Sequence, residues 1–317
     1  MATHVFLTID TELMWRHHAA GLDIAAIAAR SLEPAGVGIG WQLERLAAHG
    51  LKATFFVDPM PALVHGIGPI RAVVESILAA GQEVQLHLHP NWAGASAADR
   101  AVHGSFELTD LSAAAQRDLI ARARDLLREA RAPEPVAFRS GSYAANDDTL
   151  AALAALGIAY DSSHNGCEHP WPSAIALPPR RIAPLAHGGV IEVPVTVIED
   201  RVGRLRHFQI CALSAGEMRA ALDHAARARH AAVTIVGHSF ELSNRAGTRP
   251  NRVHVARFEA LCRMLANRRE SLPTAHFADR PALPLDREDA PLGASLVRTG
   301  WRQVEQLWSN LVEERAA

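Results

Sequence analysis

Two histidines that lie two residues apart are the clearest chemical signal in the sequence. They belong to the segment GQEVQLHLHPNW at 81–92. Apolar and polar residues alternate there, which predicts a strand whose polar face carries Gln85, His87 and His89. Two imidazoles on one strand face can reach a single metal ion. Pro90 ends the strand, so the histidine pair is expected at its C-terminal end.

Titratable residues also follow other predicted strands, at the point where each strand ends. The C-terminal ends of parallel strands in a barrel meet at one mouth, where active sites are built. Residues far apart in the sequence are therefore expected to meet there. They are Asp10 and Glu12 after the first strand, Arg139 after the fourth, Asp161 after the fifth and His238 after the seventh.

These residue types suit metal-assisted hydrolysis. Two histidines and one carboxylate form a common catalytic zinc site, with positions left for water and substrate. The metal polarises a carbonyl and lowers the pKa of its bound water toward neutrality. A second carboxylate can accept the proton of the water, and a histidine can protonate the leaving group. Asp10 and Glu12 are two residues apart, so both can point into the same mouth with different roles.

The elements that must position these residues alternate between strand and helix. Strands are predicted at 4–9, 53–57, 84–89, 136–139, 158–161, 190–197 and 232–236, with a last short strand near 274–277. Helices are predicted at 21–30, 40–49, 69–80, 111–131, 147–156, 214–229, 254–268 and 294–314. Gly50 is expected to cap the C-terminal end of the helix at 40–49. Ser112 and the Ser214–Glu217 capping box are expected to cap the N-terminal ends of the helices at 111–131 and 214–229. This order predicts an α/β fold with a parallel sheet, and a barrel of about seven strands suits it better than an open sheet.

Length and composition limit the class of protein. The chain has 317 residues, a hydrophobic content of 49%, a formal net charge of −2 and 17 histidines. No basic stripe indicates nucleic acid, and no apolar run reaches the length of a membrane span. Three scattered cysteines and the absence of a signal-peptide pattern predict a cytoplasmic protein with reduced thiols. We expect a barrel over 1–280 and, over 281–317, a linker and a C-terminal amphipathic helix.

Six short segments, in this order, resemble the polysaccharide deacetylases, which form the NodB-homology or carbohydrate esterase 4 family. LTIDTE is similar to the family's first carboxylate motif, and ATFF to its T-F-F run. GQEVQLHLHP resembles its histidine motif, and FRSGSY its arginine motif. YDSS resembles its D-S pair, and VTIVGHS its closing histidine strand. Together the segments lie between Val5 and Glu241.

The resemblance implies a distorted (β/α) barrel, similar to a TIM barrel, and a divalent metal that is often zinc. It implies a hydrolase in which metal-bound water attacks the amide carbonyl and removes an N-acetyl group from a sugar or polysaccharide precursor. Asp10 would then be the general base, Arg139 its orienting partner and His238 the general acid. Glu12, His87 and His89 would bind the metal. Contact with the substrate is expected from Tyr143, with its side chain or backbone at the oxyanion site, from Asp161 and from Trp92.

Three departures from the family pattern leave alternatives open. Thr11 separates the two carboxylates, His89 replaces the second histidine that the family places where Asn91 stands, and Gly141 replaces a proline. These changes resemble the lipopolysaccharide-biosynthesis branch. Asn91 remains an alternative ligand, and Asp161 could instead cap the turn formed by 162–163. The fold also allows a hydrolase of a non-sugar linear or cyclic amide, or a non-catalytic sugar-binding protein. The sequence leaves the metal, the sugar and the oligomeric state undetermined.

Overall fold

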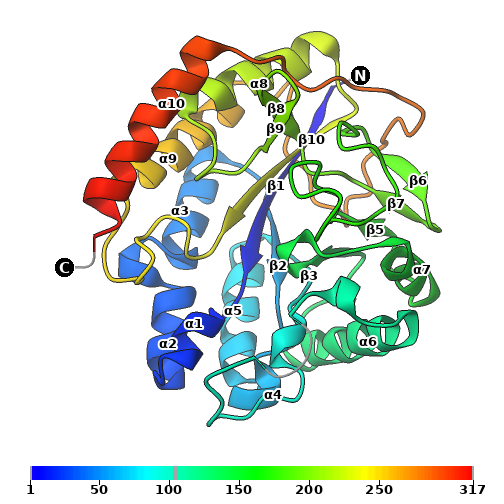
Figure 1. Ribbon diagram of the computed structural model, residues 1–317, viewed down its shortest axis with the longest axis vertical. Helices are drawn as coiled ribbons and strands as arrows, with labels where there is room; N and C mark the ends of the chain where they lie inside the picture. The colour runs from blue at the N-terminus through cyan, green and yellow to red at the C-terminus, as the bar shows by residue number, and fades with distance from the viewer. Residues whose placement is uncertain (1, 103–105, 316–317) are drawn as a thin grey trace.

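The computed structural model describes the whole chain except residues 1, 103–105 and 316–317. Its eight-stranded sheet has the strand order β10-β1-β2-β3-β4-β5-β7-β6 (Figure 1). The strands are β1 His4–Thr11, β2 Thr54–Val57, β3 Glu83–Leu88, β4 Ala137–Ser140, β5 Tyr160–Asp161, β6 Leu185–His187, β7 Val190–Glu192 and β10 Ala232–His238. All neighbours pair in parallel except β6 and β7. The sheet curls into a half-barrel, so the predicted distorted (β/α) barrel is confirmed.

Helices cover the outer face of the curled sheet (Figure 1). The longer ones are α2 Ile24–Ser31, α3 Ile39–His49, α5 Gly68–Ala79, α6 Ala113–Glu129, α7 Asp147–Ala155, α8 Ala215–Ala228, α9 Arg252–Ala266 and α10 Leu296–Trp308, which continues as the π-helix Ser309–Glu313. The predicted caps are confirmed. Gly50 adopts the left-handed conformation (φ 61°) after α3, Ser112 caps α6, and Ser214 with Glu217 forms the capping box of α8.

Alternate residues of each strand separate two apolar cores. Val5, Leu7 and Ile9 of β1 face the helices and belong to the large outer core. Phe6, from the opposite face, belongs to a small core inside the curled sheet. Phe277 fills that inner core, and its ring stacks on Phe6 with the centroids 4.4 Å apart. Since both faces of the sheet are buried, the polar residues on its inner face must be paired or functional.

Several local features differ from the predictions. The segment 274–277 makes only one bridge, from Thr274 to Val5, because it closes the inner core rather than joining the sheet. The predicted strand 190–197 is interrupted after Glu192, near Pro194, which has no N–H for a ladder. The chain then forms an unpredicted hairpin of β8 Val197–Arg201 and β9 Arg204–His207. Part of the polar loop after β1 is the short helix α1 Trp15–Ala19, and a second short helix, α4 Ala62–His65, follows β2.

The predicted linker around 281–293 has little regular structure, and α10 then packs against α8 and β8. The division of the chain at 280 stays a prediction. Within the described part of the chain, no helix is both long and apolar enough to cross a bilayer.

Register brings the predicted site residues together at the C-terminal edge of the sheet. Asp10 of β1 lies directly opposite His238 of β10. His87 of β3 lies opposite Arg139 of β4. Parallel strands align their carboxyl ends, so four residues that are up to 228 positions apart in the sequence meet at this edge.

Candidate active site

Three potential metal-binding side chains meet at the end of β1 and β3. Glu12 directly follows β1, His87 belongs to β3, and His89 directly follows it. One donor atom from each of these residues lies within 4.8 Å of the others. Two imidazoles and one carboxylate form a donor set typical of catalytic zinc sites. The residues therefore fit a divalent transition metal by their chemistry and by their spacing.

A backbone carbonyl orients His87. Its Nδ1 lies 2.8 Å from the carbonyl oxygen of Arg139, to which a protonated Nδ1 donates. This hydrogen bond leaves the lone pair on Nε2, as in most metal-binding histidines. Burial is the main cause that lowers the pKa of His87, to about 4, so the ring is neutral near pH 7. A neutral imidazole with a fixed tautomer is the form that binds a metal.

His89 and Glu12 form the second half of the donor set. His89 Nε2 lies 2.6 Å from Glu12 Oε2. Burial alone would lower the pKa of His89, but the charge and hydrogen bond of Glu12 outweigh it and raise the pKa to about 9. Burial would likewise raise the pKa of Glu12, yet His89 lowers it to about 2. A metal held by His89 and Glu12 would compete with this hydrogen bond and displace the proton that the pair shares.

Gly141 explains how His89 can take this position. A Cβ added to Gly141 would lie 2.3 Å from both Cε1 and Nδ1 of His89. No side chain beyond hydrogen therefore fits beside the ring. Two of the departures noted in the sequence are thus linked by one contact, because the glycine in R-S-G leaves the space that the second histidine of H-x-H occupies.

Arg139 holds Asp10 in a fixed orientation. The guanidinium is fully buried, and its Nη1 lies 2.7 Å from both Asp10 Oδ1 and Thr8 Oγ1. Its Nε donates to the carbonyl of Ser162 and its Nη2 to the hydroxyl, both at 3.0 Å. With Oδ1 held in this way, Asp10 Oδ2 faces His238 Nε2 at 3.9 Å. The carboxylate of Asp10 and the imidazole of His238 therefore lie on the same side as the potential metal donors Glu12, His87 and His89.

Glu241 supports His238 from behind. Its Oε2 accepts a hydrogen bond from the backbone N–H of His238 at 2.9 Å and lies 3.4 Å from the ring Nδ1. Burial alone would lower the pKa of His238, but Glu241, with help from Asp10, raises it to about 9. The imidazole is thus protonated at neutral pH, as a proton donor must be. Sequence reasoning missed Glu241, although its position three residues after His238 was visible.

Asp58 is a second site residue that the sequence analysis missed. It follows β2 and is buried, and its Oδ1 accepts the N–H of Met60 at 2.9 Å. Its Oδ2 is buried without a hydrogen-bond partner among the described residues. Burial raises the pKa of Asp58 to about 7, against the opposing charge of the neighbouring His89. The rule that found Asp10, a carboxylate just after a strand, applies equally to Asp58.

Asn91 and Tyr143 also have buried polar atoms near the site. Asn91 Oδ1 has no hydrogen-bond partner among the described residues, and Asn91 lines the same cavity as Glu12 and His89. The Tyr143 hydroxyl is likewise buried without a described partner. Tyr143 has a φ of 60°, which is strained for a residue with a side chain. Burial, followed by the charge of Asp10, raises the pKa of its hydroxyl. These atoms are available to a ligand, and their roles stay predictions.

Asp161 and Trp92 are both buried side chains. Asp161 is fully buried and accepts hydrogen bonds from the N–H and hydroxyl of Ser163. It also shares a hydrogen bond with Glu192, and burial raises the pKa of both carboxyls. These contacts favour the turn-capping role that was left open for Asp161. Trp92 is only 1% exposed and packs edge-on against Trp15. Substrate contact by either residue stays a prediction.

A cavity of about 290 Å³ opens beside the metal donors. Its lining includes Glu12, His89 and Asn91. The other lining residues are mainly aromatic, aliphatic and cationic: Leu13, Met14, Trp15, Trp92, Phe106, Arg16 and Arg245. A cavity of this volume is at the lower end of the range for small-molecule sites.

Residues 42–160 match the family model for polysaccharide deacetylases. This segment of the chain is therefore similar to the polysaccharide deacetylases. The match includes β2, β3 and β4, and therefore His87, His89 and Arg139. Among the curated proteins, none matches the sequence significantly.

Solved structures of polysaccharide deacetylases and an allantoinase share the fold. A Mycobacterium smegmatis protein described as a polysaccharide deacetylase is 20% identical, with a TM-score of 0.55 over 91% of this chain and 95% of that one. A Pseudomonas aeruginosa polysaccharide deacetylase is 15% identical, with a TM-score of 0.52 over 87% and 89%. The PuuE allantoinase is 14% identical, with a TM-score of 0.54 over 87% and 88%. At these identities the likeness concerns the fold.

The contact of Gly141 with His89 gives a prediction about metal binding. In Gly141→Ala the new methyl group would displace the imidazole, and we expect the zinc affinity to fall about 10–100-fold, as when the support of a ligand is lost. Equilibrium dialysis with zinc measures this. Gly68→Ala is the matched control, because nothing lies within 4 Å of the Cβ it would add. An unchanged affinity in Gly141→Ala would exclude His89 as a ligand.

Proposed function

We propose that the protein is a metal-dependent hydrolase that removes an N-acetyl group from a carbohydrate. The observation that carries this proposal is the position of Glu12, His87 and His89 beside an Asp10 that Arg139 orients. The match of residues 42–160 to the polysaccharide deacetylase model supports the same reaction class. The metal would be held by the two imidazoles and the Glu12 carboxylate. Asn91 stays an alternative oxygen donor.

The residues of the chain supply the proton transfers. A divalent metal, when bound, polarises a carbonyl and acidifies a water molecule. Asp10 accepts a proton from the attacking water, and Arg139 keeps the carboxylate aimed at it. The water oxygen bonds to the amide carbon, and the carbon–nitrogen bond breaks. His238 donates its proton to the leaving amine, so acetate and a free amino sugar are formed.

Replacement of Asp10 or His87 tests this proposal. Asp10→Asn removes the base, and we expect the rate of acetate release from N-acetyl sugars to fall by about 10²–10⁴-fold. His87→Ala removes a metal ligand, so bound zinc should be lost together with activity. Acetate release and metal content are measured on each protein.

Two controls accompany these variants. His49→Ala changes a partly exposed histidine at the end of α3 and should leave metal content and rate unchanged. Thermal unfolding must show that Asp10→Asn and His87→Ala still fold, since Asp10 is the charge partner of buried Arg139. Folded variants with undiminished acetate release would refute the assigned roles.

The support of His238 by Glu241 predicts a shift in the pH profile. His238 acts when protonated, so activity is lost as the pH rises through its pKa, which is about 9. Glu241→Gln removes the charge that holds this pKa up, and the alkaline limb of kcat/KM should move to lower pH. Glu44→Gln, an exposed change on α3, should not move the limb. An alkaline limb that stays in place in Glu241→Gln would contradict a proton donated by His238.

Two arginines in the cavity favour an acidic substrate. Arg16 packs over the Phe240 ring at 5.6 Å, and its Nε is buried without a described hydrogen-bond partner. Burial, followed by the nearby charge of Arg245, lowers the pKa of Arg16. Two like charges therefore line the same cavity as Glu12 and His89. A carboxylate or phosphate on the sugar would relieve their repulsion and accept their hydrogen bonds.

This arrangement predicts a preference among substrates. Loss of one charged hydrogen bond in Arg245→Gln should raise KM for an N-acetylated sugar acid about tenfold, with little effect on the neutral sugar. Arg249→Gln, a change on the same loop outside the cavity wall, is the control. Equal effects of Arg245→Gln on acidic and neutral sugars would remove the preference while leaving the deacetylase proposal intact.

Hydrolysis of a non-sugar cyclic amide is the second candidate, because the PuuE allantoinase has the same fold with a TM-score of 0.54. The same proton transfers could open a cyclic ureide, since the chemistry again requires attack on an amide carbonyl. A panel that compares N-acetyl sugars with cyclic ureides separates the two candidates. Turnover of ureides alone would replace the deacetylase proposal.

A further inference from the structure

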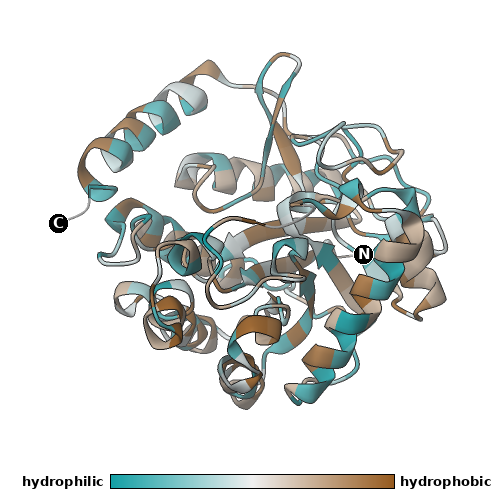
Figure 2. Cartoon of the chain, turned by 60° about the horizontal axis from the view of Figure 1, so that its bottom comes forward, coloured by the Kyte–Doolittle hydropathy of each residue, from teal (hydrophilic) through white to brown (hydrophobic). Residues whose placement is uncertain are grey.

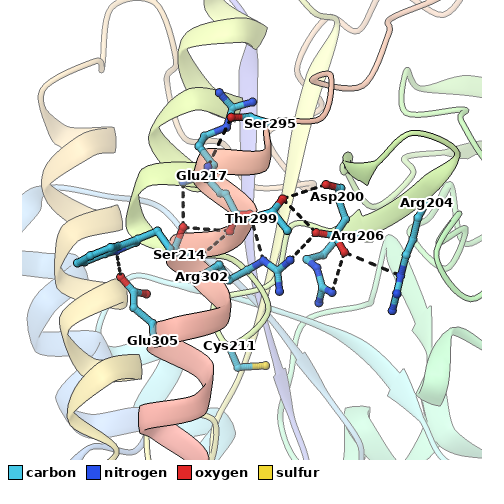
Figure 3. Close-up of polar contacts among 12 residues, drawn as sticks. Asp200, Arg204, Arg206, Cys211, Ser214, Glu217, Ser295, Thr299, Arg302 and Glu305 are labelled. Atoms are coloured by element: carbon cyan, nitrogen blue, oxygen red, sulfur yellow. Dashed lines mark hydrogen bonds and ion pairs between the residues drawn. The ribbon is translucent and has the colours of Figure 1, made fainter.

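The face of α10 that packs against the protein is polar. Arg302 is buried and pairs with Asp200 and with Glu217, whose Oε1 accepts from Arg302 Nε at 3.1 Å (Figure 3). Thr299 donates its hydroxyl proton to the carbonyl of Asp200 at 2.9 Å. Arg257 of α9 bonds Glu305 at 2.8 Å. These contacts anchor α10 to the rest of the protein.

The following π-helix is held by polar contacts as well. Asn251 Nδ2 donates to Ser309 Oγ at 2.9 Å and to Glu314 at 2.8 Å. The N–H of Arg245 donates to the second oxygen of Glu314, also at 2.8 Å. Rotation of α10 about its axis would leave buried charges such as Arg302 unpaired, which is strongly unfavourable. The orientation of the helix is therefore fixed.

This orientation turns the apolar side of α10 toward solvent. The helix lies at the edge of the molecule, and hydrophobic residues recur along it (Figures 1 and 2). Trp301 and Val304 are each 62% exposed, Trp308 is 58% exposed and Val297 is 84% exposed. Surface helices normally direct their apolar side inward. The exposed residues that form this apolar face are Leu296, Val297, Trp301, Val304, Leu307, Trp308, Leu311 and Val312.

The spacing of the apolar face is that of a helix-pairing seam. Residues 297, 301, 304, 308 and 311 follow one another at alternating intervals of four and three. This is the a/d pattern by which two helices pack side chains into each other. The residues are Val, Trp, Val, Trp and Leu, an order that is nearly the same in both directions. A two-fold axis places identical surfaces against each other, and a symmetric seam suits that requirement.

Charge and area favour a protein partner over a lipid surface. Helices that bind anionic membranes carry an excess of Lys or Arg beside the apolar side. Residues 296–315 contain three arginines, three glutamates and no lysine. The apolar face comprises eight large hydrophobic side chains that are 37–84% exposed. A continuous apolar face of this kind on a monomer marks an interaction site, and a standard protein interface buries about 800 Å² per partner.

We propose that α10 pairs antiparallel with α10 of a second copy of this chain, so that the apolar faces of the two helices form a homodimer interface. This inference is independent of the proposed function.

The test is the molar mass of the full-length protein in solution, measured by light scattering after size exclusion. We expect the wild type to have about twice the mass of the 34.2 kDa chain. Val304→Glu would bury a charge at the centre of the two paired apolar faces, so this variant should have the molar mass of a monomer. Because Val304 is exposed, this change should not disturb folding, which circular dichroism verifies. In Val304→Cys, oxidation should produce a cross-linked dimer.

Val202→Glu is the matched control, since Val202 is 94% exposed but lies in the turn between β8 and β9 and is not part of the apolar face. This variant should remain dimeric. A monomeric wild type at all concentrations would overturn the proposal, as would a dimer that Val304→Glu leaves intact. Sedimentation with phosphatidylglycerol vesicles covers the alternative, because a monomeric wild type that pellets with vesicles would assign the apolar face to lipid.

Discussion

The buried guanidinium of Arg139 is the constraint on which the candidate site depends. Removing a charge from water costs several kcal/mol unless it is fully paired, and about 3–5 kcal/mol is lost when one partner is removed. Arg139 is paired by Asp10, Thr8 and both polar groups of Ser162, and it lies 4.5 Å from the Phe56 ring centroid. It thereby ties β4 to β1 and to the segment after β5. Its own carbonyl orients His87, so one residue positions both the predicted base and a predicted metal ligand.

The second constraint is the close approach of His89 to Gly141. A strand places His87 and His89 on the same side, but the second ring needs space beside β4. Gly141 supplies that space because it has no Cβ. The shortened histidine spacing and the glycine in the arginine motif are therefore parts of one local arrangement. Each departure alone looks like the loss of a family feature, whereas together they retain a three-donor site.

The two ends of the sheet have different tasks. At the C-terminal end, the pKa values of the titratable side chains are shifted, and some buried polar atoms lack hydrogen-bond partners among the described residues. Both features are typical of ligand-binding and catalytic sites. At the other end, Glu83 accepts hydrogen bonds from the N–H groups of Phe277 and Ala278, which close the inner core. Glu83 belongs to the G-x-E part of the histidine motif. Its contacts indicate stability, while His87 four residues later serves the site.

The sequence alone predicted the barrel, its strand order along the chain and three helix caps, which depend on residues a few positions apart. It also identified Asp10, Glu12, His87, His89, Arg139 and His238, since each lies at or just after a strand end. Their chemical roles stay predictions, but the structure brings them together. The same pattern, a carboxylate directly after a strand, also holds for Asp58.

The tertiary structure alone decided the contacts between distant segments. The space beside Gly141, the pairing of Asp161 with Glu192 and the support of His238 by Glu241 depend on side-chain directions that spacing does not fix. The clearest case is α10. Its periodicity predicted an amphipathic helix, but a helical pattern is the same whichever side faces inward. Asp200 and Glu217, contributed by β8 and α8, pair with Arg302 and so turn the apolar side outward.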